Sequence, residues 1–400
     1  MKNNRDAVIV AMGRSAIGDF GGSLKALRAY QLAAQVMKAV IDKSGVDPAK
    51  LEDVMLGDCV QCADEANTAR TAMLAAGIPV HVPAVTIQRQ CSSAMQTLSM
   101  AAANIAAGFG DLYLAGGVES MSNAPYVLPN ARWGARLRHG QMMDAMWEML
   151  HSGSNLLEKK GYIMGQTAEN LARKYDISRE DQDIVALRSH ANAEAAIKAG
   201  KFAEEIIPIQ IPQRKGDPKI VDTDEHVRFG LAMDDLTKLK PAFASDGTVT
   251  AGNSSGLNDG AAICLVASRE KAAELGLTPI AKIIGAAAAG CEPHLMGWGP
   301  VPSTQKLLKQ TGAELKDIEL IELNEAFAAQ YVAVERGLGL NRDITNVNGS
   351  GVGLGHPVGC TGARIVISLV NEMKRRGNTL GLATLCVGGG MGMSTLVEVE

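Results

Sequence analysis

The sequence predicts an α/β protein built from two similar halves around an inserted segment. Strand and helix patterns alternate at the start of the chain, and the same plan returns at its end. The stretch between them is rich in charged helical runs and shows little strand alternation. Alternating strands and helices are typical of a parallel sheet covered by helices. We therefore expect a first half at residues 1–121 that is completed by 251–276, an inserted and largely helical loop domain at 122–250, and a second half at 277–400.

Size and composition limit the class of protein. Four hundred residues, of which 46% are hydrophobic, suffice for two or three domains with their own cores. The net charge of −4 and the scattered lysines and arginines provide no basic stripe, so we expect no nucleic-acid partner. No apolar run is long enough for a signal peptide or a membrane span, which predicts a cytoplasmic protein without a membrane partner. Seven cysteines, an odd number, favour free thiols over a disulfide framework.

The first half contains several buried strand patterns and a long amphipathic helix pattern. The helix pattern covers residues 26–43, and a glycine-rich GGVES segment closes the last strand. The strands are expected at residues 7–11, 54–56, 85–87 and 112–115. Their alternation with helices favours parallel pairing.

The second half repeats this plan. Residues 45–58 have a counterpart at 311–325, with a helix end, an acidic turn and a strand in each. The helix that follows Cys91 corresponds to the segment 355–377, and the strand AAICLVAS corresponds to STLVEVE at the C-terminus. Such an internal repeat predicts a pseudo-twofold arrangement of two α/β units. Because corresponding helix N-termini can face each other in such a pair, we expect Cys91 to lie near His356.

Cys91 is the first candidate catalytic residue. It stands between the strand at 85–87 and a helix pattern that covers 95–107, with Ser92 and Ser93 as expected N-caps. Backbone N–H groups and the helix dipole at such a position favour a thiolate and lower the pKa of the cysteine. The alternative is a structural cysteine, because free cysteine is among the most buried residue types.

Three further positions carry reactive groups in the second half. His356 ends a glycine-dense loop just before a helix and could act as a base toward a nearby thiol. Cys386 ends a buried strand beside a run of glycines, whose N–H groups could form an oxyanion hole. Asn324 follows a strand and could hold a water or a carbonyl group, or it could cap a helix. Each of these residues also has an ordinary structural interpretation.

Cys59 and Cys62 form a CxxC motif that must be weighed as a metal or redox site. No second CxxC and no suitably spaced histidine pair accompanies it. A structural zinc site needs about four ligands, so we assign no metal.

Taken together, these motifs resemble the thiolase family. The family's order and spacing are matched by CSSAMQ, GGVESMS, NEAFA, GLGHPVGCTGAR and CVGGGMG. The resemblance also includes RSAIGDFGG, MGQTAENLA and DGTVTAGNSSGLNDGAA, and it covers essentially the whole chain. It implies the thiolase fold, in which two βαβαβαββ halves are related by pseudo-twofold symmetry around an inserted loop domain.

The resemblance implies a 3-ketoacyl-CoA thiolase, an acetyl-CoA C-acyltransferase that works by a ping-pong mechanism. Cys91 matches the nucleophile that becomes acylated, and His356 matches the base that takes its proton. Asn324 matches the residue that holds the water of the first oxyanion hole. Cys386 matches the acid/base at the α-carbon, and the N–H groups of Cys91 and Gly388 match the second oxyanion hole.

Coenzyme A is implied as a co-substrate, with no metal and no permanently bound cofactor. Arg228 matches a residue that contacts the nucleotide end of CoA. Pantetheine-contacting positions are matched by Ser255, Phe243, Met164, Met296 and Phe327. Family members also imply a homodimer or homotetramer, with an accessory partner subunit as an alternative.

Some residues depart from the family pattern. Four of them are expected to alter the lining of the site: Gln88, Ala94, Ser350 and Cys360. Ile163 stands where the acetoacetyl-CoA subclass usually has histidine, which favours thiolysis of a larger 3-ketoacyl group. The methionine-rich stretch 139–162 is expected to help shape the acyl pocket.

Several alternatives stay open at this point. They are condensation to acetoacetyl-CoA, a thiolase for aromatic or branched substrates that needs a partner subunit, and a non-catalytic acyl-CoA-binding protein. A role in the degradation of fatty acids and a role in the degradation of aromatic acids would each suit a 3-ketoacyl-CoA thiolase. A decarboxylating ketoacyl synthase shares the architecture but normally uses a Cys-His-His set, whereas this chain has Asn324 and Cys386 in addition to Cys91 and His356.

Overall fold

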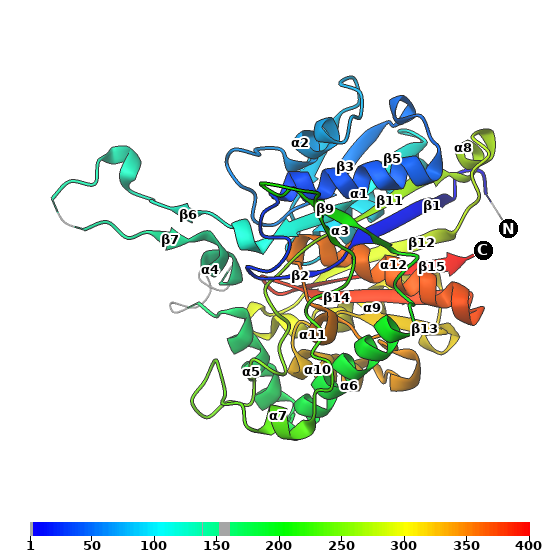
Figure 1. Cartoon of the computed structure of the whole chain (residues 1–400). Helices are drawn as coiled ribbons and strands as arrows, with labels where there is room; N and C mark the ends of the chain where they lie inside the picture. The colour runs from blue at the N-terminus through cyan, green and yellow to red at the C-terminus, as the bar shows by residue number, and fades with distance from the viewer. Residues whose placement is uncertain (1–2, 138, 152–160) are drawn as a thin grey trace.

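A computed structural model describes residues 3–137, 139–151 and 161–400. The predicted α/β fold is confirmed (Figure 1). One mixed sheet runs in the order β13-β14-β15-β12-β1-β11-β5-β3-β4. Its strands are β1 (Ala7–Ser15), β3 (Asp53–Gly57), β4 (Ala84–Ile87), β5 (Leu112–Ser120), β11 (Asn258–Ser268), β12 (Ala281–Gly290), β13 (Leu320–Leu323), β14 (Leu380–Val387) and β15 (Met391–Val399).

The strand order is symmetric about the pair β1 and β12. From β1 outward, β11 is antiparallel to β1, β5 is antiparallel to β11, and β3 is parallel to β5. From β12 outward, β15 is antiparallel to β12, β14 is antiparallel to β15, and β13 is parallel to β14. The helices between the strands are α1 (Ala29–Ser44), α2 (Thr68–Ala75), α3 (Ser93–Ala107), α8 (Arg269–Glu274), α9 (Pro300–Thr311), α10 (Ala328–Leu338), α11 (Gly351–Leu354) and α12 (Val358–Arg376). This is the internal symmetry that the sequence repeat predicts.

The segment between the two halves forms four α-helices of different length and several short strands among the described residues. Its helices are α4 (Ala145–Leu150), α5 (Met164–Lys174), α6 (Arg179–Lys198) and α7 (Met233–Thr237), and its strands are β6 (Tyr126–Val127), β7 (Met143–Asp144), β8 (Ile206–Ile207), β9 (Ile209–Ile211) and β10 (Lys219–Val221). Helices α5 and α6 pack against α10, whereas β6 and β7 begin an arm that projects from the body (Figure 1). Near the start of the chain lies β2 (Gly18–Asp19), and the 3-10 turn η4 (Pro293–Trp298) precedes α9.

Three apolar clusters explain why the sequences of the strands are continuous hydrophobic runs. In β11, Cys264 belongs to a central cluster that contains α3 and α12, whereas Ile263 belongs to an outer cluster with α1 and α2. A second outer cluster joins α9 and α10 to the strands of the C-terminal half. Because both faces of the sheet are covered, inward and outward side chains are apolar alike. Helices α3 and α12 therefore form a layer that is shared by both halves.

Helices α3 and α12 approach each other very closely. A side chain at Gly362 would place its Cβ 2.5 Å from the backbone nitrogen of Met95. Only glycine permits this approach without displacement of one helix. The contact lies within the first turns of both helices, so it fixes their N-termini near one another.

Two local expectations were wrong. The strands that begin at Ala7 and at Leu112 extend to Ser15 and Ser120, past the predicted apolar runs, because their polar ends have buried partners such as the Arg14–Asp224 ion pair. Ser92 occupies the N-cap of α3, but its side chain makes no cap hydrogen bond and donates instead to the Arg89 carbonyl at 3.0 Å. None of the described helices is long and apolar enough to cross a membrane.

Candidate active site

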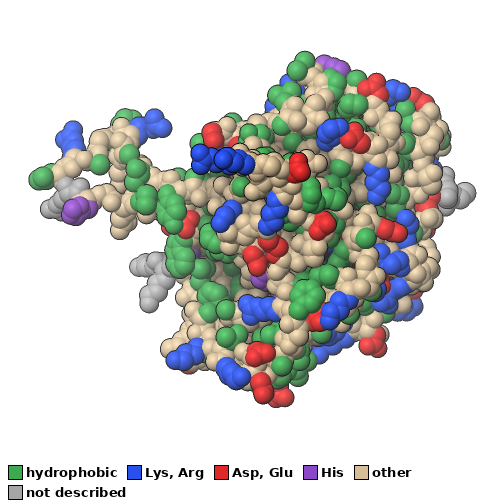
Figure 2. Space-filling view, viewed as in Figure 1, with side chains coloured by type: hydrophobic (Ala, Val, Ile, Leu, Met, Phe, Trp, Pro, Cys, Tyr) green, Lys and Arg blue, Asp and Glu red, His purple; other side chains and the backbone are tan. Residues whose placement is uncertain are grey.

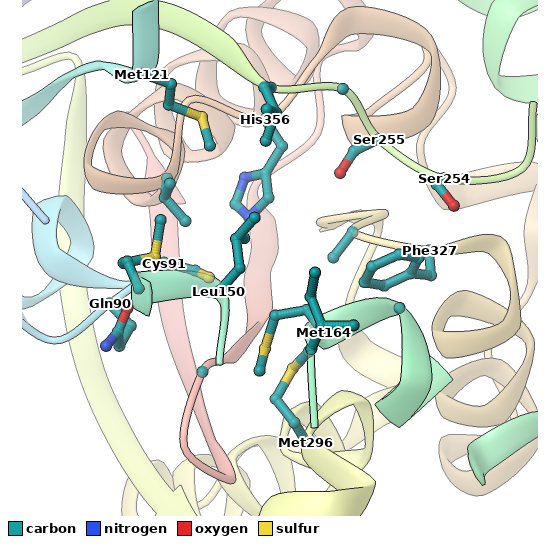
Figure 3. Close-up of a pocket in the computed structure, with 18 of the residues that line it drawn as sticks. Gln90, Cys91, Met121, Leu150, Met164, Ser254, Ser255, Met296, Phe327 and His356 are labelled. Atoms are coloured by element: carbon teal, nitrogen blue, oxygen red, sulfur yellow. The ribbon is translucent and has the colours of Figure 1, made fainter. Parts of the chain in front are cut away.

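A pocket lies at the N-terminal ends of the two central helices, between both halves and the inserted segment. In Figure 3, Cys91 and His356 reach into it from one side, and Ser255 and Phe327 lie across from them. Its lining consists of Gln90, Cys91, Met121, Met149, Leu150, Ile163, Met164, Gly165, Phe243, Ser254, Ser255, Gly256, Leu257, Met296, Ala326, Phe327, His356, Val358 and Gly388. The structure therefore brings Cys91 and His356 together, as the sequence repeat predicts.

The Cys91 thiol is almost completely buried, with 8% exposure. Burial raises its pKa to about 11, although N–H groups of Gly388 and of Cys91 itself donate toward the sulfur and oppose the shift. The expectation of a lowered pKa was wrong, because the loss of hydration outweighs the helix N-terminus in this apolar pocket. Cys91 is therefore a neutral thiol in the free protein at pH 7. The two N–H groups are those that the sequence comparison assigns to the second oxyanion hole.

His356 is held as a neutral imidazole. Burial lowers its pKa to about 3, and the charge of Arg364 acts in the same direction. Its Nδ1 lies 2.7 Å from the Thr361 hydroxyl, which itself donates to the Pro357 carbonyl at 2.9 Å. Because the hydroxyl proton is used there, we assign Nδ1 as the donor to Thr361, which leaves Nε2 without a proton. An unprotonated Nε2 is what a base for a thiol requires.

Asn324 and Cys386 lie behind this pair and not on the pocket surface. The Asn324 amide nitrogen is 3.4 and 3.5 Å from the two ring nitrogens of His356, and its Oδ1 has no hydrogen-bond partner among the described atoms. Burial, and then the charge of Cys91, raise the pKa of Cys386 well above its usual value, so this thiol keeps its proton. A neutral thiol is a proton donor, as an acid at carbon must be.

The residues matched to pantetheine contacts gather in the same pocket. Phe243 and Phe327 meet edge to face with ring centres 6.2 Å apart, and Met164 and Met296 lie nearby (Figure 3). Ser255 is fixed by its N–H, which donates to the Ala326 carbonyl at 3.0 Å.

Arg228 is not brought into this pocket. Its side chain is exposed, and its backbone N–H donates to His190 Nδ1 at 3.2 Å. An exposed cation outside the pocket can meet only the part of a long ligand that emerges from it.

Apolar side chains dominate the lining of the pocket that holds Cys91. Ile163, Met121, Met149 and Leu150 all line it. The predicted contribution of the stretch 139–162 thus rests on Met149 and Leu150, and residues 152–160 lie outside the described residues. Among the residues that the structure describes, the four other departures from the family pattern do not line the pocket, so the expectation that they alter the lining was wrong.

Two supporting residues were missed by the sequence analysis. Thr361 orients the His356 ring, and Asn258 Oδ1 accepts the His356 backbone N–H at 2.8 Å. Thr361 lies five residues after the histidine in the GHPVGCTGAR motif, and a search for hydroxyls in the first turn of the helix that follows the base would have found it. Asn258 lies about a hundred residues away, and no local signal connects it to His356.

The cysteine predictions can also be compared with the structure. All seven cysteines are free, which confirms the expected thiols. The two thiols of the CxxC motif point to different carbonyls, because Cys59 donates to Gln90 and Cys62 donates to Asn123. Cys62 also lies near Asp64 and Glu65, but Arg28 pairs with both carboxylates.

Comparison with known proteins decides the family. The N-terminal domain of thiolase matches residues 7–270, and the C-terminal domain of thiolase matches residues 277–399. The chain belongs to the thiolase family. As a member of this family it is an acyltransferase, and thiolases use CoA as a co-substrate.

Similar thiolases cover nearly the whole chain. The acetyl-CoA acetyltransferase of Chromobacterium violaceum is 48% identical over 98% of this chain and 99% of its own length. A crystal structure of the Bacillus anthracis acetyl-CoA acetyltransferase shares 51% identity at a TM-score of 0.96 and covers 99% of both chains. Human mitochondrial 3-ketoacyl-CoA thiolase shares 40% identity at a TM-score of 0.95 and covers 99% of this chain and 100% of its own.

The raised pKa of Cys91 predicts the pH dependence of its alkylation by iodoacetamide. Because the folded protein holds the thiol protonated below about pH 11, the reactive thiolate should increase roughly tenfold per pH unit from pH 7 to 10. The rate should be measured for the Cys91 peptide by mass spectrometry, with the urea-unfolded chain as the control. A plateau below pH 8 in the folded protein would show a stabilised thiolate and contradict this assignment.

Proposed function

We propose that this chain is a 3-ketoacyl-CoA thiolase, which cleaves its substrate with CoA through an acyl-cysteine at Cys91. The observation that carries the proposal is the meeting of a buried thiol and a neutral imidazole at one pocket, with the thiol of Cys386 buried behind them and close enough to Cys91 to feel its charge. The family supports acyl transfer with CoA as co-substrate. The individual roles rest on the geometry below.

In the first step, Cys91 Sγ attacks the 3-keto carbon while His356 Nε2 takes the thiol proton. The new S–C bond forms, and the bond between the α and β carbons breaks, so that acetyl-CoA leaves as an enolate. Cys386 gives its proton to that carbon. The N–H groups of Cys91 and Gly388, which point at Sγ, stabilise the oxyanion that forms on the attacked keto carbon, and Asn324, next to His356, supports the site of the thioester oxygen of the leaving enolate.

In the second step, the thiol of free CoA attacks the acyl-cysteine. Its proton passes to the Cys386 thiolate that the first step left, the new thioester forms, and Cys91 leaves with the proton returned by His356, so that all three groups regain their starting state. Splitting the transfer into two steps gives ping-pong kinetics. The pantetheine arm of CoA would lie along Phe243, Phe327 and the methionines opposite, with Arg228 near the exposed nucleotide end.

The apolar wall favours an acyl group larger than acetyl. Ile163, Met121, Met149 and Leu150 offer carbon and sulfur but no hydrogen-bond donor beside Cys91. A longer, branched or aryl chain gains about 0.8 kcal/mol for each methylene that it buries there. Degradative cleavage of such a 3-ketoacyl-CoA is therefore the direction that we propose.

A second candidate is condensation of two acetyl-CoA molecules to acetoacetyl-CoA. The observation that favours it is the name of the similar proteins, which include acetyl-CoA acetyltransferases at 44–48% identity. The same residues would serve both directions, because each proton transfer and each bond change is reversible. The candidates differ in the size of the acyl group that the pocket beside Cys91 accepts.

The exposed apolar side chains of the projecting arm support the proposal that the chain forms a homo-oligomer. Trp133 and Leu137 lie on it with 82% and 95% of their surfaces exposed. Figure 2 shows hydrophobic side chains along this arm, whereas positive and negative side chains are mixed over the visible face of the body. Exposed aromatic and aliphatic groups at a tip usually mark a protein interface. A dimer or a tetramer of this chain is the partner that we propose for the arm.

The function is tested by incubating the purified protein with CoA and a panel of 3-ketoacyl-CoAs, namely acetoacetyl, medium-chain, branched and aryl. We expect cleavage with formation of acetyl-CoA, and loss of at least a thousandfold in kcat for Cys91→Ser, since a nucleophile is removed. Product formation should be followed by mass spectrometry. No cleavage of any substrate by the well-folded protein would favour a missing partner subunit or a non-catalytic acyl-CoA-binding protein.

Ile163→His tests the assignment of acyl size. A polar ring beside Cys91 should lower kcat/KM for the medium-chain substrate about tenfold while that for acetoacetyl-CoA is kept or raised, because an apolar contact is lost. The control is Val80→His, at a position that is 75% exposed and outside the pocket. Equal effects of Ile163→His on both substrates would exclude this position as a determinant of acyl size.

A further inference from the structure

Glu119 is a fully buried carboxylate close to the proposed active site. It lies near the end of β5, and three backbone N–H groups donate to it. Its Oε1 accepts from Val60 at 3.1 Å, and its Oε2 accepts from Cys59 at 3.2 Å and from Gly359 at 2.9 Å. A buried carboxylate is retained only where such donors replace its hydration.

These three donors come from two separate loops. Cys59 and Val60 follow β3, whereas Gly359 lies in the first turn of α12, three residues after His356. A Cβ at Gly359 would meet the Val118 carbonyl at 2.4 Å and Glu119 Oε2 at 2.9 Å, so this turn rests directly on the end of β5. Glu119 therefore ties the loop of the base to the loop that contains Cys59.

Cys59 connects this carboxylate to the nucleophile. Its Sγ donates to the Gln90 carbonyl at 3.1 Å. The same carbonyl accepts from the N–H of Ser93 at 2.9 Å and from the Ser93 hydroxyl at 2.7 Å. Three donors thus converge on the residue that precedes Cys91.

Gln90 needs this support because its backbone is strained. Its φ is +46°, in the left-handed region that residues with a side chain rarely adopt. Such a conformation persists only where the surroundings enforce it, and strain of this kind concentrates at functional sites. The direction of the Cys91 side chain follows from the Gln90 conformation.

The protonation states agree with these roles. Burial, and then the charge of Glu119, raise the pKa of Asp58 well above its usual value, so Asp58 keeps the proton of this pair. Burial raises the pKa of Glu119 as well, but the three N–H groups that face it oppose this shift, whereas Asp58 receives only the Thr68 hydroxyl, at 2.6 Å. Burial, followed by the charge of Glu119, also raises the pKa of Cys59 well above its usual value, which keeps Cys59 a thiol that can donate.

We propose that Glu119 and Cys59 are positioning residues, which together hold Gln90, and hence Cys91, in register with the loop that carries His356. Neither residue lines the pocket or touches the substrate in the mechanism given above. This inference rests on the proposed function for its kinetic effect, but the geometry of Cys91 can be tested without turnover. A displacement of about 1 Å in such a site can lower a rate a hundredfold.

Cys59 offers a matched pair of variants. Cys59→Ala removes the donor to Gln90, whereas Cys59→Ser keeps a hydroxyl donor at the same position. We expect Cys59→Ala to lower kcat about tenfold with KM for CoA changed less than twofold, and Cys59→Ser to recover most of kcat. Cys62→Ala, at the other thiol of the motif, should behave as wild type because its Sγ contacts Asn123 and not Gln90.

A readout without turnover accompanies the kinetics. The rate of iodoacetamide alkylation at Cys91 should change severalfold in Cys59→Ala and in Glu119→Gln, but not in Cys59→Ser, while the rate at the half-buried Cys291 stays the same. Should Glu119→Gln fail to fold, the two Cys59 variants decide the question.

The outcomes separate this inference from the proposed function. If wild type cleaves no 3-ketoacyl-CoA, the proposed function fails, and the alkylation rates alone test the positioning role. If wild type is active and Cys59→Ala matches Cys59→Ser in both kcat and Cys91 alkylation, the positioning role is overturned. An equal loss in Ala and Ser variants with a raised KM for CoA would also overturn it, because it would indicate general damage to the fold.

Discussion

The close packing of α3 on α12 is the constraint on which the rest of the structure depends. The two helices occupy equivalent places in the two halves, and Gly362 lets them approach within backbone contact near their N-termini. A cysteine precedes the first residue of α3 by two positions, and a histidine precedes the first residue of α12 by the same distance. Internal symmetry thereby brings a thiol and an imidazole together at one end of a buried layer, a pairing that a single half could not provide.

The sequence predicted the parts of this arrangement that depend on pattern and repetition. The strand and helix periods follow from residues close together in the chain, and the meeting of Cys91 with His356 follows from comparing the two repeated segments. The pKa of Cys91 could not be predicted in this way. The helix N-terminus is visible in the sequence, but the apolar side chains that bury the thiol come from the inserted segment and the second half. The support of His356 by Asn258, and of Gln90 by Cys59, depends in the same way on contacts between distant segments.

Burial keeps the reactive groups of this site uncharged until a substrate binds. Cys91 and His356 are both neutral in the free protein, so no charge is left in the apolar pocket before a substrate arrives. In the proposed mechanism, proton transfer from Cys91 to His356 accompanies attack on the carbonyl, His356 carries the positive charge, and the negative charge on the carbonyl oxygen develops where N–H groups are already aimed. Preorganised donors of this kind are most effective in a site that excludes water.

The most direct test of this account is to trap the acyl-enzyme. The protein should be mixed with a medium-chain 3-ketoacyl-CoA in the absence of free CoA, quenched in acid, digested and analysed by mass spectrometry. We predict an acyl group on the Cys91 peptide, which disappears when CoA is added before the quench. Acylation of another cysteine with Cys91 unmodified, or turnover of the same substrate by the Cys91→Ser variant at the wild-type rate, would contradict the account.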